Sequence, residues 1–339
     1  MQNFSTPEQA ATWLHQRGAR RLHTDSRKVV AGDAFLAWPG ARHDGRRHIE
    51  SSLQRGAAAC LIEARGHQQA ASTALSQACA TYTDLKWACG PIAAAYYEHP
   101  SRQMDLVALT GTNGKTSCAW WLAQALVCLG QRCAMVGTLG LGEVLMPPQQ
   151  AVQLQGMNTG LTTPDAVLLQ GALRDFVQAG VRSCVIEASS IGLVEGRLDG
   201  TRIRIGVLTN FTQDHLDYHG DMDAYWQAKQ RLFDWPGLEW AVVGIDDPKA
   251  IELLHHLSHH RPQLKVLSYG LGSGAQLRAE GVRWQTMRDG QWGQSLTICH
   301  ADQRQPMEIP WVGEHNVRNA LAAAAATSSA GIGVDAVRA

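Results

Sequence analysis

The segment from Leu109 to Ser117 constrains the fold of this chain more than any other part of the sequence. It reads LTGTNGKTS, follows the apolar run Leu106–Leu109 and precedes a helical pattern that begins near Thr116. A buried strand, a glycine turn and a helix in this order are typical of a phosphate-binding loop, where glycines let backbone N–H groups approach phosphate oxygens. The Lys115 amine can reach the outer phosphates, and the Thr116 hydroxyl can bind Mg²⁺. We therefore expect a nucleoside triphosphate site.

The spacing differs from the commonest phosphate-loop pattern, G-x-x-x-x-G-K-[ST], which has glycine where this chain has Leu109. A plain glycine turn beside an unrelated lysine is the alternative interpretation. The strand before the loop and the helix after it favour the functional one, because a phosphate loop needs both.

Strands alternate with helices after residue 100, which predicts a doubly wound, mostly parallel sheet in an α/β fold. We expect strands at 105–110, 133–138, 181–188, 203–210 and 241–247, helices at 116–129, 165–179 and 314–330, and a β-rich appendage over 264–310. Thr163 is the expected N-cap of the second helix, and Pro164 its first residue. Ligands bind at the carboxyl ends of parallel strands, so the phosphate loop, Glu187 and the segment 210–219 should lie close together.

Residues 1–99 form a separate pattern that predicts a small α/β domain, with a strand at 57–63 and helix over 68–97, broken near Gly90-Pro91. The predicted division is therefore a first domain over 1–99 and a second over 100–334.

Composition excludes several classes of protein. Lys+Arg and Asp+Glu each number 30, so no charge excess indicates a nucleic acid or a membrane surface. No apolar run approaches the roughly 20 residues of a spanning helix, and the N-terminus is not typical of a signal peptide. The eight cysteines form no C-x-x-C pair, which predicts buried free thiols. We expect a cytoplasmic protein with no nucleic-acid partner and no membrane insertion.

Two groups of residues could bind metal. Glu187 ends an apolar strand, where a carboxylate is costly unless it is paired or binds a cation, so we expect it to bind Mg²⁺ rather than to form a structural salt bridge. His215 and His219 have the i, i+4 spacing of a zinc helix, but Leu216 stands where that motif needs Glu. The histidine-rich run 255–260 is expected to be a solvated helix end rather than a metal site.

Taken together and in this order, the motifs resemble those of the Mur ligases, and within that family most closely the MurE type. They are GTNGKT (111–116), TTP (162–164), EASS (187–190), TNFTQDHLDYHG (209–220) and AYWQAK (224–229). Near the N-terminus, TDSR (24–27), GDAF (32–35) and HDGR (43–46) are similar to the uridine-nucleotide-binding domain of the same family. The resemblance covers about residues 20–330.

The resemblance implies an ATP-dependent ligase that adds a diamino acid, which we expect to be meso-diaminopimelate, to UDP-N-acetylmuramoyl-L-alanyl-D-glutamate through an acyl phosphate. The implied cofactors are ATP and Mg²⁺, and a monomer is expected. The family has a third domain, which docks the amino acid. It should begin near residue 335, so 335–339 would be the start of a linker to it.

The resemblance also implies a role for individual residues. Lys115, His215 and Lys229 would be catalytic, with Lys229 carbamylated rather than an ordinary surface lysine. ATP would be held by Gly111, Thr112, Asn113, Gly114, Lys115, Thr116, Ser117, Asn316 and Asn319, with Asp246 nearby. Mg²⁺ would be bound by Thr116, Glu187, His215 and Lys229. The UDP-linked substrate would be held by Thr24, Ser26, Ala41, Arg42, His43, Thr162, Thr163, Ser189, Glu195 and Arg197.

The sequence departs from the family pattern at Ile191, where histidine is frequent, and at Glu195, where glutamine is usual. Glu195 places an extra negative charge near an anionic substrate, which puts its contact in doubt.

Two alternatives stay open: a module that binds nucleotide and UDP-substrate without ligation, and another ligase of the same superfamily, such as the next-step Mur ligase or folylpolyglutamate synthetase. The N-terminal motifs argue against the folate enzyme. A phosphate-loop protein that binds nucleic acid is disfavoured because no basic stripe exists.

Overall fold

The computed structural model describes residues 1–40, 43–66, 77–146 and 151–331 as two compact units. The first unit contains Met1–Gln103, Pro164–Ala179 and Glu195–Thr201, and the second contains the rest of the described chain. Two segments of the first unit therefore come from a stretch that the sequence assigns to the second domain. The domain boundaries at 99 and 334 remain predictions.

A parallel sheet with strand order β1-β5-β4-β3-β2 forms the centre of the first unit. Its elements are β1 (Gln2–Phe4), α1 (Pro7–Gln16), β2 (Leu22–His23), β3 (Ala34–Ala37), α2 (Ile49–Gln54), β4 (Ala59–Glu63), β5 (Cys79–Tyr82), α4 (Leu85–Tyr96) and α6 (Ala166–Gln178). Strand side chains alternate between two cores. Ala34 and Leu36 pack with α1 and α4, whereas Phe35 and Ala37 pack with α2.

The helix predicted over 68–97 is wrong for part of its length. Cys79–Tyr82 is a strand that lies between β1 and β4, and helix α4 begins only at Leu85; residues 67–76 lie outside the described chain. Pro91 does not break α4, since the helix runs through it to Tyr96. At Gly90 a Cβ would collide with the Asp199 carbonyl, so this glycine permits close packing within the unit rather than ending the helix.

The second unit is built on an 11-stranded sheet with the order β16-β15-β14-β13-β12-β11-β6-β10-β7-β8-β9. Its strands are β6 (Asp105–Thr110), β7 (Cys133–Gly137), β8 (Gly140–Leu145), β9 (Gln153–Met157), β10 (Ser183–Glu187), β11 (Ile205–Leu208), β12 (Trp240–Gly244), β13 (Lys265–Gly270), β14 (Leu277–Thr286), β15 (Trp292–His300) and β16 (Gln303–Ile309). The strands from β7 to β13 in this order are parallel, and both ends of the sheet are antiparallel. The predicted fold class is confirmed.

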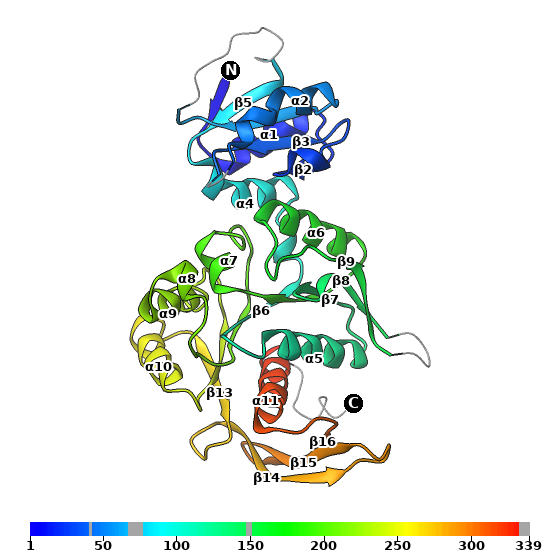
Figure 1. The fold of residues 1–339 in the computed structure, drawn as a ribbon, viewed down its shortest axis with the longest axis vertical. Coiled ribbons are helices and arrows are strands. Elements are labelled where there is room, and N and C mark those ends of the chain that lie inside the picture. The colour runs from blue at the N-terminus through cyan, green and yellow to red at the C-terminus, as the bar shows by residue number, and fades with distance from the viewer. Residues whose placement is uncertain (41–42, 67–76, 147–150, 332–339) are drawn as a thin grey trace. The chain divides into compact units, whose positions relative to one another are not determined.

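The predicted β-rich appendage is a continuation of the main sheet. β14 pairs with β13, and β15 and β16 follow it as an antiparallel meander (Figure 1). The helices of this unit are α5 (Lys115–Cys128), α7 (Ser190–Val194), α8 (Leu216–His219), α9 (Met222–Gln230), α10 (Pro248–His260) and α11 (Glu314–Ser329). Helices α5 and α11 lie side by side and share one apolar core with the central strands and the meander (Figure 1).

The start of α6 differs from the prediction. The helix begins at Ala166 and its N-cap is Asp165, whose carboxylate accepts the Val167 and Leu168 N–H groups at 3.1 Å. The Thr163 hydroxyl is used elsewhere, since it donates to the Glu187 carbonyl at 2.7 Å and accepts the Ser189 N–H at 3.1 Å. Asp is as good a cap as Thr, so local pattern alone could not separate the two.

Two other expectations are confirmed. All eight cysteines are free thiols; Cys128 is half-buried and the other seven are buried. The histidine-rich run ends α10, where His256 bonds Asp234 at 3.0 Å. Within the described ranges, no helix combines the length and the apolar character that crossing a bilayer requires.

Gly90→Ala should destabilise the first unit by about 1–3 kcal/mol, because the added methyl group overpacks the contact with the Asp199 backbone. Urea unfolding of the full chain measures this. Gly272→Ala is the control, since nothing lies within 4 Å of a Cβ at that position. Equal stability of the two variants would contradict the packing argument.

Candidate functional site

Two glycines shape the phosphate loop between β6 and α5. Gly111 has φ +142° and Gly114 has φ +81°, backbone conformations that favour glycine. A Cβ at Gly111 would collide with the Thr209 hydroxyl, and one at Gly114 would collide with the Asn319 amide. The loop therefore has its predicted form, and it is packed between the end of β11 and helix α11.

The residues after β11 hold the loop by hydrogen bonds. The Asn113 N–H donates to Asn210 Oδ1 at 2.9 Å, and Asn210 Nδ2 donates back to the Asn113 carbonyl at 3.0 Å. The Thr209 hydroxyl also donates to that carbonyl at 2.7 Å. The prediction marked Asn210 as near the loop but missed Thr209; the adjacency of both residues to a strand end was the available signal.

Lys115 and Ser117 lie in the first turn of α5. The Lys115 amine donates to the Gly111 carbonyl at 2.9 Å and to the Thr112 carbonyl at 2.8 Å. Burial lowers the pKa of Lys115, while the negative charges of Glu187 and Asp214 oppose that shift. A lysine held beside the loop in this way can donate to phosphate oxygens there.

Glu187 is fully buried at the end of β10, as predicted. Its carboxylate accepts the Thr116 hydroxyl at 2.9 Å, the Thr138 N–H at 2.9 Å and the Thr138 hydroxyl at 3.3 Å. A Cβ at Gly137 would collide with this carboxylate. The structure therefore brings Thr116 and Glu187 together, and it adds Thr138, which sequence reasoning missed.

Lys229 is buried within α9 instead of lying on the helix surface. Its amine donates to the Gly111 carbonyl at 2.7 Å and lies 4.3 Å from the centre of the Tyr225 ring. Burial, reinforced by the charge of Lys115, lowers the pKa of Lys229 to about 6, and Asp214 opposes the shift only partly. The amine is therefore largely neutral at pH 7, which is the form that reacts as a nucleophile.

His215 begins α8 with φ +51°, an uncommon conformation for a residue other than glycine. Its ring lies 3.5 Å from Asp214 and stands nearly perpendicular to Tyr225, with ring centres 6.0 Å apart. His219 bonds the Ser190 hydroxyl at 2.9 Å, and burial together with Lys229 lowers the pKa of its ring. The His219 ring therefore has a protein partner, Ser190.

Of the predicted Mg²⁺ ligands, the structure brings the Glu187 carboxylate and the Thr116 hydroxyl together. No three His, Cys, Asp or Glu side chains come together as metal ligands in the part of the chain that the structure describes. The predicted site would therefore also need His215 and an oxygen carried by Lys229. Mg²⁺ takes few protein oxygens and retains several waters, so the two oxygens that meet fit it, whereas the ring nitrogen of His215 is not a ligand type that Mg²⁺ prefers.

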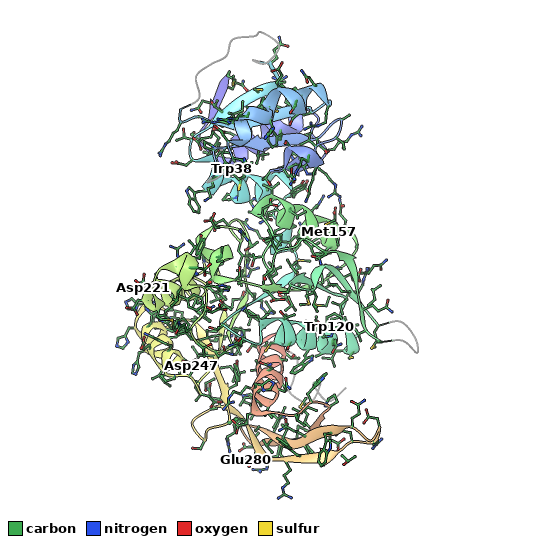
Figure 2. All side chains as sticks on the ribbon, viewed as in Figure 1. Trp38, Trp120, Met157, Asp221, Asp247 and Glu280 are labelled. Carbon is green, nitrogen blue, oxygen red and sulfur yellow. The ribbon has the colours of Figure 1, made fainter. Side chains whose placement is uncertain are left out.

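A cavity of about 680 Å³ lies beside the phosphate loop. It is lined by Asn113, Gly114, Thr209, Asn210, Phe211, Thr212, Gly244, Asp246, Asp247, Pro248, Tyr269, His315, Arg318 and Asn319. Figure 2 labels Asp247, which caps α10 and accepts the Phe211 N–H at 2.6 Å. The described lining includes Asp246 and Asn319 as predicted, but not Asn316, whose amide donates to the Val312 carbonyl at 3.0 Å.

In the first unit, Thr24, Ser26 and His43 line a second cavity of about 700 Å³. Ala41 and Arg42 lie outside the described residues. Two local Asp-x-Arg units shape the rim of this cavity. Asp25 accepts the Arg27 N–H at 3.0 Å and Asp44 accepts the Arg46 N–H at 3.0 Å, each at the start of a short 3₁₀ helix.

The Asp25 and Asp44 carboxylates also pair with the guanidinium groups of Arg27 and Arg46, both at 2.8 Å. Hydrogen bonding to Arg27 lowers the pKa of Asp25 to about 2. These motif residues therefore fix backbone turns at the cavity, a role that the sequence prediction did not give them.

The predicted dipeptide contacts fall in both units. Thr162, Thr163 and Ser189 belong to the second, where the Thr163 hydroxyl lies 3.0 Å from that of Ser189. Glu195 and Arg197 belong to the first. The Glu195 carboxylate lies 2.8 Å from the Lys86 amine, so the extra charge that the sequence places here is paired.

Comparison with known proteins gives matches over nearly the whole chain. The model of the Mur ligase middle domain matches residues 109–327, and that of the Mur ligase family catalytic domain matches residues 20–92. Relatives named UDP-N-acetylmuramoyl-L-alanyl-D-glutamate–2,6-diaminopimelate ligase include one from Acidovorax sp. (strain JS42), 45% identical over 98% of this chain and 64% of its own length. Another, from Janthinobacterium sp. (strain Marseille), is 42% identical over 91% of this chain and 60% of its own.

Solved structures are also similar. A structure titled with the same ligase name is 30% identical with a TM-score of 0.77, over 94% of this chain and 61% of that one. MurF ligase from Thermotoga maritima in complex with ADP has a TM-score of 0.64 at 18% identity, over 95% of this chain and 66% of that one, which shows a shared fold. This chain thus spans about three fifths of the length of the relatives that it matches.

The low pKa of Lys229 should make stability depend on pH. Between about pH 6 and 10.5 the unfolded lysine is protonated and the folded one is neutral, so wild-type stability should rise with pH relative to Lys229→Met. The difference in free energy of unfolding between wild type and Lys229→Met should increase by about 1.4 kcal/mol per pH unit between pH 7 and 9. Urea unfolding in CO₂-free buffers measures this difference. The control, the exposed Lys265→Met, keeps Lys229 and should give a stability profile parallel to that of wild type. Parallel profiles for wild type and Lys229→Met would refute the assignment.

Proposed function

Because the chain belongs to the Mur ligase family, we propose that it takes part in ATP-dependent amide bond formation on UDP-N-acetylmuramoyl-L-alanyl-D-glutamate. We take the incoming amino acid to be meso-diaminopimelate, because relatives with 42–45% identity are named as 2,6-diaminopimelate ligases. The observation that carries the proposal is the convergence of the phosphate loop, the buried Glu187 and the buried Lys229 at one edge of the parallel sheet.

The reaction proceeds in two steps. The D-glutamate carboxylate attacks the γ-phosphorus of ATP and ADP leaves, which gives an acyl phosphate. The amine of the amino acid then attacks the acyl carbon, inorganic phosphate leaves, and an amide forms with loss of a proton. Lys115 neutralises charge on the transferred phosphoryl group, and backbone N–H groups of the loop hold the neighbouring phosphates.

Mg²⁺ would be held by Glu187, His215 and Thr116, together with a carbamate on Lys229, and would supply further neutralisation of phosphate charge. The neutral Lys229 amine can attack CO₂ and release a proton, which converts the amine into a carbamate anion. Asp246 and Asn319 line the cavity next to the loop. We place the nucleoside of ATP in this cavity. ATP as the nucleotide and Mg²⁺ as the ion are part of the proposal.

The proposal assigns residues to each part of the UDP-linked substrate. The uridine nucleotide occupies the cavity lined by Thr24, Ser26 and His43. Thr162, Thr163, Ser189 and Arg197 hold the muramoyl dipeptide, and Glu195 contributes as an ion pair with Lys86 rather than as a free charge. A monomer in the cytoplasm, with domains over 1–99 and 100–334, completes the proposal.

A calorimetric titration of the chain with UDP-N-acetylmuramoyl-L-alanyl-D-glutamate, in the presence of Mg²⁺ and a non-hydrolysable ATP analogue, tests the acceptor site. Saturable binding should be lost with UDP-N-acetylmuramate, which lacks the dipeptide. Binding of the analogue alone would refute the acceptor assignment. Binding of both ligands without amide formation would favour the alternative of a binding module.

Lys115→Ala should abolish ATP-dependent acyl-phosphate formation and leave UDP-substrate binding largely intact, because the two ligands use different residues. Phosphate release and calorimetry measure the two properties separately, with the exposed Lys265→Ala as control. Equal loss of both properties would show that the sites are not separate.

Lys229→Ala should lose acyl-phosphate formation and regain part of it with added short carboxylates, which can replace the carbamate oxygens in the space that the lysine vacates. Phosphate release over a series of formate and acetate concentrations measures this. An active variant that carboxylates do not affect would defeat the carbamate assignment.

A further inference from the structure

The phenol of Tyr225 lies where the proposed catalytic groups converge. The side chain is fully buried on α9. The first turn of this helix is capped by Asp221, which Figure 2 labels and which accepts the Ala224 N–H at 2.8 Å. Nothing in the proposed reaction uses this residue. Its contacts nevertheless extend to the phosphate loop, to Lys229 and to the segment that carries His215.

The hydroxyl group of Tyr225 bonds the phosphate loop. It lies 3.2 Å from the Thr112 hydroxyl, which donates to the Thr212 carbonyl at 3.0 Å and accepts the Thr212 N–H at 2.9 Å. A threonine hydroxyl has one proton, and that proton is used on the Thr212 carbonyl. Tyr225 is therefore the donor to Thr112, and burial, which raises the pKa of its phenol, keeps the required proton in place.

The ring of Tyr225 forms one wall around the Lys229 amine. The two residues are four apart on α9 and so lie on the same face of the helix. The Lys229 nitrogen is 4.3 Å from the ring centre, while the Gly111 carbonyl accepts from it at 2.7 Å. The ring and the carbonyl together restrict the amine to one position beside the loop.

Other rings hold Tyr225 in turn. Phe211 lies 5.1 Å from it between ring centres, His219 also 5.1 Å, and His215 6.0 Å at nearly a right angle. Phe211 and His215 come from the segment after β11, and His219 ends α8. A displacement of the Tyr225 ring would therefore reach both the segment after β11 and helix α8.

We propose that Tyr225 is a positioning residue that couples the phosphate loop to Lys229, with the hydroxyl holding Thr112 and the ring face holding the lysine amine. The inference rests on the proposed nucleotide site. The two contacts use different parts of one side chain, so two substitutions separate them. Tyr225→Phe removes the hydroxyl and keeps the ring, whereas Tyr225→Leu removes the ring as well.

Binding of a non-hydrolysable ATP analogue with Mg²⁺, measured by calorimetry, tests the hydroxyl. Tyr225→Phe should weaken binding about fivefold, the effect of one lost hydrogen bond. Tyr82→Phe is the control, because Tyr82 is a buried tyrosine in the other unit whose hydroxyl also makes one hydrogen bond, to the Ser5 carbonyl at 3.4 Å. Unchanged affinity in Tyr225→Phe would overturn this half of the proposal.

Proton–carbon NMR of protein labelled at the lysine ε-carbons tests the ring. Protons above an aromatic face are shifted upfield, so the Lys229 ε-protons should be upfield in wild type and in Tyr225→Phe, and should return to the ordinary position in Tyr225→Leu. Lys229→Met assigns the signal by deleting it. An ordinary Lys229 signal in wild type, or an upfield one in Tyr225→Leu, would overturn this half.

Recorded in CO₂-free buffer without ligands, the NMR signature involves neither carbamate formation nor ligation, so it can fail or succeed without regard to the proposed reaction. Conversely, absence of analogue binding in wild type would refute the nucleotide site, and with it the coupling. Thermal unfolding of each variant shows whether it is folded, and Tyr225→Phe preserves the packing should Tyr225→Leu be too unstable to study.

Discussion

Removal of ionisable side chains from water, complete for Glu187 and Lys229 and partial for Lys115, is the constraint that the rest of the site satisfies. A charge without partners inside a protein costs several kcal/mol, and the structure meets this cost in three ways. Donors from Thr116 and Thr138 surround the Glu187 carboxylate. Carbonyls of the loop accept from Lys115. Lys229 instead has its pKa lowered until the amine gives up its charge. The three groups thus remain chemically distinct although they share one edge of the sheet.

The parts of the site that could be predicted are those where an apolar strand ends in polar residues. The phosphate loop after β6, Glu187 after β10 and the segment after β11 each follow a recognisable buried run, and parallel strands bring such ends together. This reasoning needs only local pattern and one rule of topology. It succeeds because a parallel sheet leaves few alternatives for the position of a strand end.

Features set by contacts between distant segments could not be predicted. The four residues of β5 read as helix because their pairing with β1 and β4 is not visible locally. Thr163 and Asp165 can both cap a helix, but the Thr163 hydroxyl accepts the N–H of Ser189, a residue 26 positions away, instead of an N–H of α6. The Lys86–Glu195 pair joins residues more than a hundred positions apart, and the lone charge at Glu195 gave no sign of its partner. The Asp-x-Arg units are local, but only the structure shows that they cap 3₁₀ helices.

The apolar core shared by α5, α11 and the meander has a thermodynamic consequence. Helix α5 carries the phosphate loop at its start, and its buried face packs in the same cluster as Leu277, Leu296 and Ile309 of β14–β16. Elements that share a core tend to open as one cooperative unit. Any ligand that binds only the folded loop stabilises that whole unit by mass action. Slower hydrogen exchange would then extend to strands that the ligand never touches, so the meander reports on occupancy of the loop from a distance.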